Sequence, residues 1–276
     1  PVQQVWHLGN NYSQLASARK EVTTSNKIIR IAHFDTGYDP SHICYDDKII
    51  RHDLERNFVE EDKTPNNAAD KYSEGPLRMP GHGTGTLSLL AGAILDLKDS
   101  GFNDSIGLNQ NIEIVPVRIS KSVVLFKNSA FAEALEYIIS LYDDESTRCH
   151  IVTMSMGGNA SRHWADVVNK AYEKGIFIVT AAGNNFGRST PRTLIYPARF
   201  NRVVAACGVT CDYSPYYKTF SLDNLNNMQG NFGPKRFMKT AIAAFTPNVP
   251  WARMGCRTVI SYAGAGTSSA TPQVAA

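Results

Sequence analysis

The sequence predicts an α/β fold, a three-layer sandwich in which a mostly parallel central sheet is covered by helices on both faces. Short runs of apolar and β-branched residues alternate along the chain with longer amphipathic segments. Alternation at these lengths is typical of βαβ units, which build parallel sheets buried on both sides. The chain has 276 residues, 43% of them hydrophobic, so it can bury a large core without disulfide bonds.

The strands are predicted where a short apolar run is too brief for a helix. In chain order these runs are KIIRIAHFD (27–35), IEIVPVRI (112–119), HIVTMS (150–155), IFIVTAAG (176–183), RVVAACGV (202–209) and TVISYAG (258–264). We expect each of them to be a buried strand of the sheet.

The helices are predicted where apolar residues recur with helical spacing. These segments are TGTLSLLAGAIL (84–95), SAFAEALEYIISLY (129–142) and SRHWADVVNKAYEKG (161–175), and a last helix begins within GTSSATP. The polar stretches 58–76 and 214–239 are predicted to be surface loops. We therefore expect one domain over residues 1–276, ending partway through its last helix.

Composition excludes several classes of function. The net charge is +3 and no basic run stands out, which argues against a nucleic-acid partner. No apolar stretch approaches the roughly 20 residues of a membrane-spanning helix. The five cysteines form no CxxC pair, and we expect them to be small buried residues. A disulfide between two of them stays open, so cysteine usage does not decide the compartment.

Four polar residues lie where a parallel sheet gathers its sites, at strand ends and helix starts. Asp35 closes the first strand, His82 opens a helical segment, Asn184 follows the strand 176–183, and Ser268 lies at the start of the last helix. Each has an ordinary structural explanation when taken alone: a turn Asp, a capping His, a turn Asn and an N-cap Ser. Together they supply an acid, a base, an amide donor and a nucleophile.

The stretch GAGTSSATP (264–272) allows two interpretations. A glycine loop between a strand and a helix can hold a phosphate at the helix N-terminus. It can also present a serine beside backbone N–H groups that stabilise an oxyanion. The nucleotide interpretation requires a small residue at the sixth position, which is Ser269 here. The pattern therefore favours a nucleophile at Ser268.

Five blocks, DTGYD, HGTGT, MSMGGN, TAAGNN and GTSSATP, occur in an order that resembles the subtilisin-like serine peptidases, or subtilases. The resemblance implies that Ser268 attacks the scissile carbonyl and that His82 takes and returns its proton. Asp35 would hold the imidazole, and Asn184 with the Ser268 N–H would bind the oxyanion.

The resemblance also implies where a substrate binds. Residues of the MSMGGN and TAAGNN blocks would form the two walls of the primary pocket and pair with the substrate backbone: Ser155, Met156, Gly157 and Gly158 on one side, Ala181, Ala182 and Gly183 on the other. Glycines there leave room for an added peptide strand. A second pairing edge is expected within 120–127. The substrates would be proteins or peptides, and a propeptide is compatible with the pattern.

The chemistry implied by the resemblance needs no cofactor, but a structural calcium ion stays open. FNDSIGL (102–108) is similar to a calcium-binding loop of many subtilisins, in which Asp104 and the carbonyls of Phe102, Ile106 and Leu108 would be ligands. Cys44 stands where the family has an aspartate ligand, and Gly85 replaces a second histidine of the HGTH block.

Two alternative functions are compatible with parts of this pattern. A sedolisin-like acid peptidase shares the serine loop, but it uses a Glu–Asp pair where this chain has His82. A catalytically silent subtilase fold that serves as a binding module would be favoured by loss of a triad residue, and none is lost. Because most subtilases are exported, the resemblance favours secretion, while the odd cysteine count keeps an intracellular enzyme open.

Overall fold

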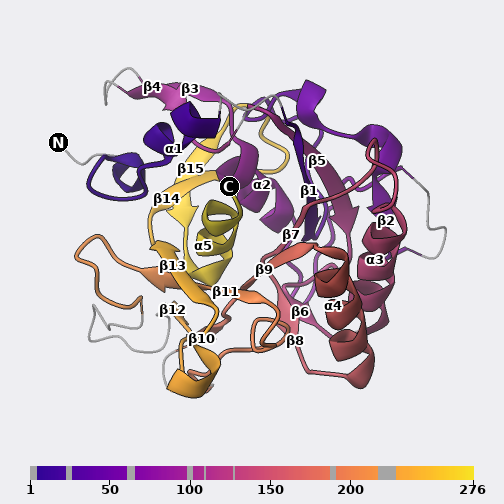
Figure 1. Cartoon of the computed structure of the whole chain (residues 1–276). Helices are drawn as coiled ribbons and strands as arrows, with labels where there is room; N and C mark the ends of the chain where they lie inside the picture. Colours follow the sequence, from indigo (N-terminus) through magenta and orange to yellow (C-terminus); the bar gives the residue numbers. More distant parts are fainter. Residues whose placement is uncertain are drawn as a thin grey trace.

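The computed structural model places a seven-stranded sheet at the centre of the molecule (Figure 1). It describes residues 5–22, 27–60, 66–97, 102–108, 110–126, 128–186, 191–216 and 228–276. The strand order is β13-β11-β9-β7-β1-β5-β2, and every neighbouring pair is parallel. The strands are β1 (Ile29–Asp35), β2 (Arg56–Asn57), β5 (Ile112–Arg118), β7 (Ile151–Met154), β9 (Phe177–Ala181), β11 (Val204–Val209) and β13 (Ala241–Phe245).

Helices cover both faces of this sheet, as the sequence predicts (Figure 1). One face carries α2 (His82–Ala91) and α5 (Gly266–Ala275), and the other carries α3 (Asn128–Ser140) and α4 (Arg162–Lys174). A short helix, α1 (Leu15–Val22), lies toward the N-terminus. No described helix combines the length and apolar character needed to cross a membrane.

Alternation along β1 explains the two cores. Ala32 and Phe34 pack into the core on the α3–α4 side, whereas Ile31 packs into the core on the α2–α5 side. Because successive strand residues point to opposite faces, His33 and Asp35 lie on the α2–α5 side together with Ile31. This register brings the polar end of β1 against the start of α2.

Two predicted elements differ from the structure. Residues 258–264 are not a buried strand of the central sheet: β15 (Ile260–Gly264) pairs antiparallel with β14 (Val249–Ala252), and most of its residues are partly exposed. The helix predicted at 84–95 begins at His82 and ends at Ala91, because residues from β3 (Ile94–Leu97) pair with β4 (Phe102–Ser105). An apolar composition alone does not tell a strand of the central sheet from a strand of a small separate sheet. Nor does it tell the end of a helix from the start of a strand.

The loop predicted at 214–239 contains β12 (Met228–Gly230), which pairs with β10 (Asn184–Phe186). Residues 61–65 and 217–227 of the two predicted loops lie outside the described residues. The two-stranded β6 (Val124–Leu125) and β8 (Gly157–Gly158) pair in parallel beside the central sheet. All five cysteines are free, and the expected burial holds for three of them but not for Cys211 and Cys256, which are exposed.

Candidate active site

Asp35 and His82 meet where the end of β1 touches the start of α2. The Asp35 Oδ1 and His82 Nδ1 atoms lie 2.7 Å apart, and both residues are buried. Close packing of the two segments requires Gly83, since a Cβ there would lie 1.9 Å from the Gly37 carbonyl oxygen. The carboxylate can therefore fix the orientation of the imidazole and stabilise its protonated form.

The environment of Asp35 keeps its carboxylate charged although the residue is only 1% exposed. Burial alone would raise its pKa, but the nearby His82 and the backbone N–H of Thr36 hold the pKa below its usual range. The Thr36 N–H donates to Oδ1 at 2.8 Å, and the Thr86 hydroxyl donates to Oδ2 at 2.9 Å. Both oxygens thus accept hydrogen bonds.

A second carboxylate, Asp70, ties the two segments together. Its Oδ2 accepts from the Thr36 hydroxyl at 2.9 Å and from the Gly81 N–H at 2.7 Å, while Arg118 donates to Oδ1 at 2.9 Å. Arg118 is fully buried at the end of β5. Sequence reasoning missed this cluster, although an arginine that closes an apolar strand was a signal, because a buried guanidinium needs carboxylate partners.

Ser268 lies in the first turn of α5, beside the end of β7. Its hydroxyl donates to the Ser155 carbonyl at 3.2 Å, and the Ser155 hydroxyl donates to the Ser268 carbonyl at 3.0 Å. Among the described contacts, no hydrogen bond joins Ser268 to His82. Both residues nevertheless line one cleft, together with Asn184.

The side chain of Asn184 is held in one orientation by the start of α5. Its Oδ1 accepts from the Thr267 N–H at 2.9 Å and from the Thr267 hydroxyl at 3.2 Å. Gly266, at φ +72°, allows this approach, because a Cβ there would lie 2.9 Å from the amide. With its oxygen engaged in this way, the amide nitrogen is left to serve as a donor on the other side of the group.

The cleft has a volume of about 510 Å³ and brings together nearly all the predicted site residues. They are His82, Ser155, Met156, Gly157, Gly158, Ala181, Gly183, Asn184 and Ser268. Ala182 is buried behind the cleft with Leu194 and Ala198.

One side chain of the cleft, Ile195, was not anticipated from the sequence. A Cβ on Gly157 would lie 2.1 Å from Ile195 Cδ1, and one on Gly183 would lie 2.9 Å from it. Ile195 therefore stands between the two predicted walls of the pocket.

The amide groups of the glycine wall already have partners in the chain. The Gly157 N–H donates to the Val123 carbonyl at 3.1 Å, and the Gly158 N–H donates to the Tyr196 carbonyl at 2.9 Å. The first of these bonds joins β8 to the segment 120–127 expected to form the second edge. An added peptide strand must use carbonyl groups of this wall or displace these contacts.

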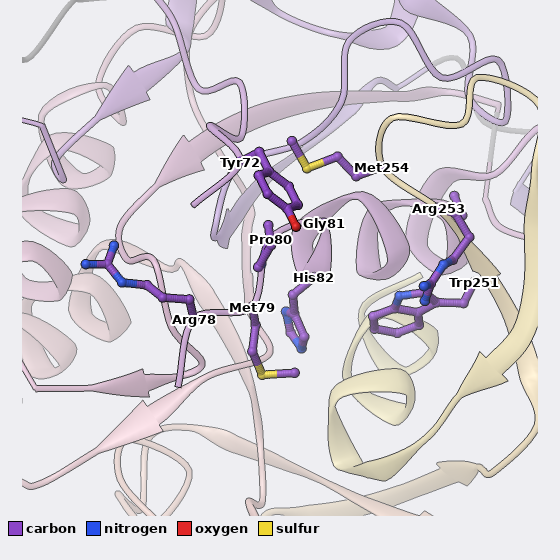
Figure 2. A pocket seen from close by; sticks show the side chains of 10 residues that line it. Tyr72, Arg78, Met79, Pro80, Gly81, His82, Trp251, Arg253 and Met254 are labelled. Atoms are coloured by element: carbon purple, nitrogen blue, oxygen red, sulfur yellow. The ribbon is translucent and has the colours of Figure 1, made fainter. Parts of the chain in front are cut away.

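A second pocket of about 420 Å³ lies beyond His82 and shares Met79, His82, Trp251 and Arg253 with the cleft. Figure 2 shows the imidazole of His82 beside the indole of Trp251, and the ring centroids lie 5.5 Å apart. Gly85 makes room for this indole, since a Cβ there would lie 1.9 Å from Trp251 Cε2. Gly85 stands where the HGTH block has its second histidine, and the indole of Trp251 occupies the space that a side chain at this position would need.

The segment that resembles a calcium loop is bound by a side chain of α1. Arg19 donates to the Asp104 carboxylate at 2.6 Å and to the carbonyls of Ser105 and Gly107 at 2.9 and 3.0 Å. The described residues contain no cluster of three or more His, Cys, Asp or Glu side chains suited to a metal. Cys44, which stands where the family has an aspartate ligand, is buried, and burial raises the pKa of its thiol. The Asp104 carboxylate, one of the oxygen ligands expected for calcium, therefore already has a cationic partner in the chain.

The chain is similar to several bacterial peptidases. Subtilisin DY of Bacillus licheniformis is 28% identical over 130 residues, 47% of this chain and 43% of that protein. Subtilisin of Bacillus pumilus is 28% identical over 182 residues, 66% of this chain and 56% of its own length. The minor extracellular protease Epr of Bacillus subtilis (strain 168) is 31% identical over 138 residues, 48% of this chain and 17% of its own. The matched regions thus span less than two thirds of these relatives.

The fold has a counterpart among solved structures. The prenylagaramide maturation protease PagA superposes with a TM-score of 0.60 at 20% identity, covering 94% of this chain and 77% of that one. A sequence profile of the Subtilase family matches residues 26–276, from just before β1 to the last residue of the chain. The match includes every motif that lines the cleft, and the chain belongs to the subtilase family.

Proposed function

We propose that the chain is a serine endopeptidase in which Ser268, His82 and Asp35 act as a catalytic triad. The observation that carries this proposal is the buried hydrogen bond between Asp35 and His82, on the wall of the cleft that Ser268 also lines. Ser268 would attack the peptide carbonyl while His82 takes the hydroxyl proton. His82 would then protonate the leaving amine as the C–N bond breaks, and water would hydrolyse the acyl-enzyme.

The first step requires a rotation of the Ser268 side chain. Its hydroxyl donates to the Ser155 carbonyl in the structure, and it would turn to donate to the free ring nitrogen of His82. Catalytic hydrogen bonds of this kind often tighten only when substrate is bound. The rotation breaks the bond to the Ser155 carbonyl, but the Ser155 hydroxyl still donates to the Ser268 carbonyl at 3.0 Å and would hold the backbone at the nucleophile in place.

Asn184 would supply one of two oxyanion donors. Its amide oxygen is engaged by Thr267, so its NH₂ group would face the charge that develops on the carbonyl oxygen. The Ser268 N–H, in the first turn of α5, would be the second donor, because N–H groups there have no partner within the helix. Preorganised donors of this kind stabilise the transition state more than the substrate.

The primary pocket would accept a small uncharged side chain. Ile195 stands between Gly157 and Gly183, so the space beside Ser268 is shortened by an aliphatic group. No Asp, Glu, Lys or Arg belongs to either predicted wall. The substrates would be proteins or peptides with residues such as Ala, Ser or Val before the scissile bond.

The reaction would need no cofactor, and Arg19 would take the structural role that calcium has in similar loops. Its guanidinium is buried and contacts the Asp104 carboxylate and the carbonyl oxygens of Ser105, the last residue of β4, and Gly107. Of the expected calcium ligands it contacts the Asp104 carboxylate, whose charge it would balance in place of a hard metal ion.

Labelling with a fluorophosphonate probe tests the proposed triad, with the adduct mapped by mass spectrometry. We expect one adduct, on Ser268 and not on its neighbour Ser269, whose hydroxyl donates to the Gly266 carbonyl at 3.0 Å. Labelling should disappear in Ser268→Ala and in His82→Ala while both variants keep the wild-type circular dichroism spectrum. A folded wild-type chain that forms no adduct would refute the peptidase and favour a silent binding module.

A further inference from the structure

The carboxylate of Asp35 is contacted by two side chains of α2, one on each oxygen. His82 Nδ1 lies 2.7 Å from Oδ1, and Thr86 Oγ1 lies 2.9 Å from Oδ2. His82 and Thr86 are four residues apart, so they lie on the same face of the helix, one turn after the other. Thr86 is 1% exposed, so water does not compete for its hydroxyl.

His33 extends this contact from the sheet. It lies two residues before Asp35 on β1, and the two side chains therefore share one face of the strand. Its Nε2 lies 2.8 Å from Thr86 Oγ1 and 3.9 Å from Asp35 Oδ2. Burial lowers the pKa of His33 to about 4, so the ring is neutral near pH 7.

The direction of these hydrogen bonds follows from proton counting. The hydroxyl of Thr86 has one proton, and the ionised carboxylate of Asp35 can only accept. The Gly83 carbonyl, 3.2 Å away, is a weaker competitor for that proton. If Thr86 donates to Asp35, its oxygen must accept from His33, which fixes the Nε2–H tautomer of that ring. The chain of donors then runs from His33 through Thr86 to Asp35.

We infer that Thr86 and His33 are positioning residues for the reaction, forming a second hydrogen-bonded arm that fixes the plane of the Asp35 carboxylate. The inference rests on the proposed role of Asp35 and His82. With Oδ2 held by Thr86, Oδ1 stays directed at His82 while the imidazole gains and loses its proton. Apolar residues at positions 33 and 86 would fill the same space without burying polar groups that need partners. A buried polar group left without a hydrogen-bond partner is costly.

The groups that face Asp35 make its proton affinity sensitive to this arm. His82 faces it from α2, His33 faces it from β1, and the Thr36 N–H faces it from the following turn. A donated hydrogen bond favours the charged form of a carboxylate. Removing the Thr86 hydroxyl therefore makes Asp35 more basic and strengthens its attraction for protonated His82. The acidic limb of the rate profile should move to higher pH.

Replacement of Thr86 tests the arm. Thr86→Val keeps the shape and removes the hydroxyl, whereas Thr86→Ser restores it. We expect kcat for a peptide substrate to fall about 10- to 100-fold in Thr86→Val with little change in KM, and to recover in Thr86→Ser. The acidic limb of kcat/KM should move up in pH in Thr86→Val alone. Thr240→Val is the matched control, since it removes a hydroxyl-to-carbonyl bond of 2.7 Å just before β13.

His33→Gln and His33→Leu test the outer end of the arm in the same way, because glutamine keeps an N–H donor and leucine does not. Equal rates and unchanged pH limbs in Thr86→Val and Thr86→Ser would overturn the inference while leaving the peptidase intact. A readout that needs no turnover is the downfield proton resonance of the His82–Asp35 hydrogen bond. We expect it to shift or broaden in Thr86→Val and not in Thr240→Val, and an unchanged resonance would equally overturn the inference.

Discussion

Shortening Ile195 should change which residue the enzyme accepts before the scissile bond. The Ile195 side chain is half-buried and touches both glycine walls, so Ile195→Ala opens space beside Ser268 without removing a core residue. Burying a phenylalanine side chain is favourable by about 1.5–3 kcal/mol. If this free energy of burial is gained in the transition state, kcat/KM for a Phe substrate should rise about 10- to 150-fold.

The assay compares peptides that differ only in the residue before the cleaved bond, with Ala, Val and Phe at that position. The wild type should cleave the Ala and Val peptides and discriminate against Phe, whereas Ile195→Ala should accept Phe and change less than about threefold on Ala. Ile195→Val should lie between the two. The reasoning is refuted if the wild type already cleaves the Phe peptide as well as the Ala peptide, or if Ile195→Ala changes both alike.

Three further outcomes are expected. Asn184→Ala should lower kcat roughly a hundred- to thousand-fold with KM nearly unchanged, the loss found when one side-chain oxyanion donor is removed from subtilisin, and a loss below tenfold would contradict the proposed role. Arg19→Ala should lower the free energy of unfolding by about 2–4 kcal/mol. A chelator should leave the melting temperature of the wild type unchanged, and a drop on adding chelator would contradict the proposal that Arg19 takes the place of calcium. Burial lowers the pKa of His33 to about 4 and of His7 to about 3, below the usual 6.5, so the stability that these neutral rings contribute should be complete above pH 6.5. The free energy of unfolding should fall toward pH 4 by about 1.4 kcal/mol per pH unit for each residue. Urea titrations should show this slope, and it should flatten in His33→Phe.

Local pattern was sufficient for β1, β5, β7, β9 and β11 of the central sheet. The apolar runs that contain β1 and β9 end at Asp35 and just before Asn184, and a parallel sheet gathers such ends at one edge. Pattern failed for residues 258–264 and for β13. Both are short and apolar, but the first pairs with β14 outside the central sheet and the second completes its edge. Pairing partners are not encoded in the composition of a single strand.

The sequence by itself determined the family, the three-layer fold and which residues could form a triad, because these depend on periodicity and on motifs that are contiguous in the chain. Only the tertiary structure revealed Asp70 with Arg118, the arm through Thr86 and His33, the Ile195 side chain in the pocket and Arg19 on the 102–108 turn. Each of these contacts joins residues from separate elements. These contacts depend on how helices and loops pack against the sheet. The local sequence of one element does not specify which distant residues it will meet.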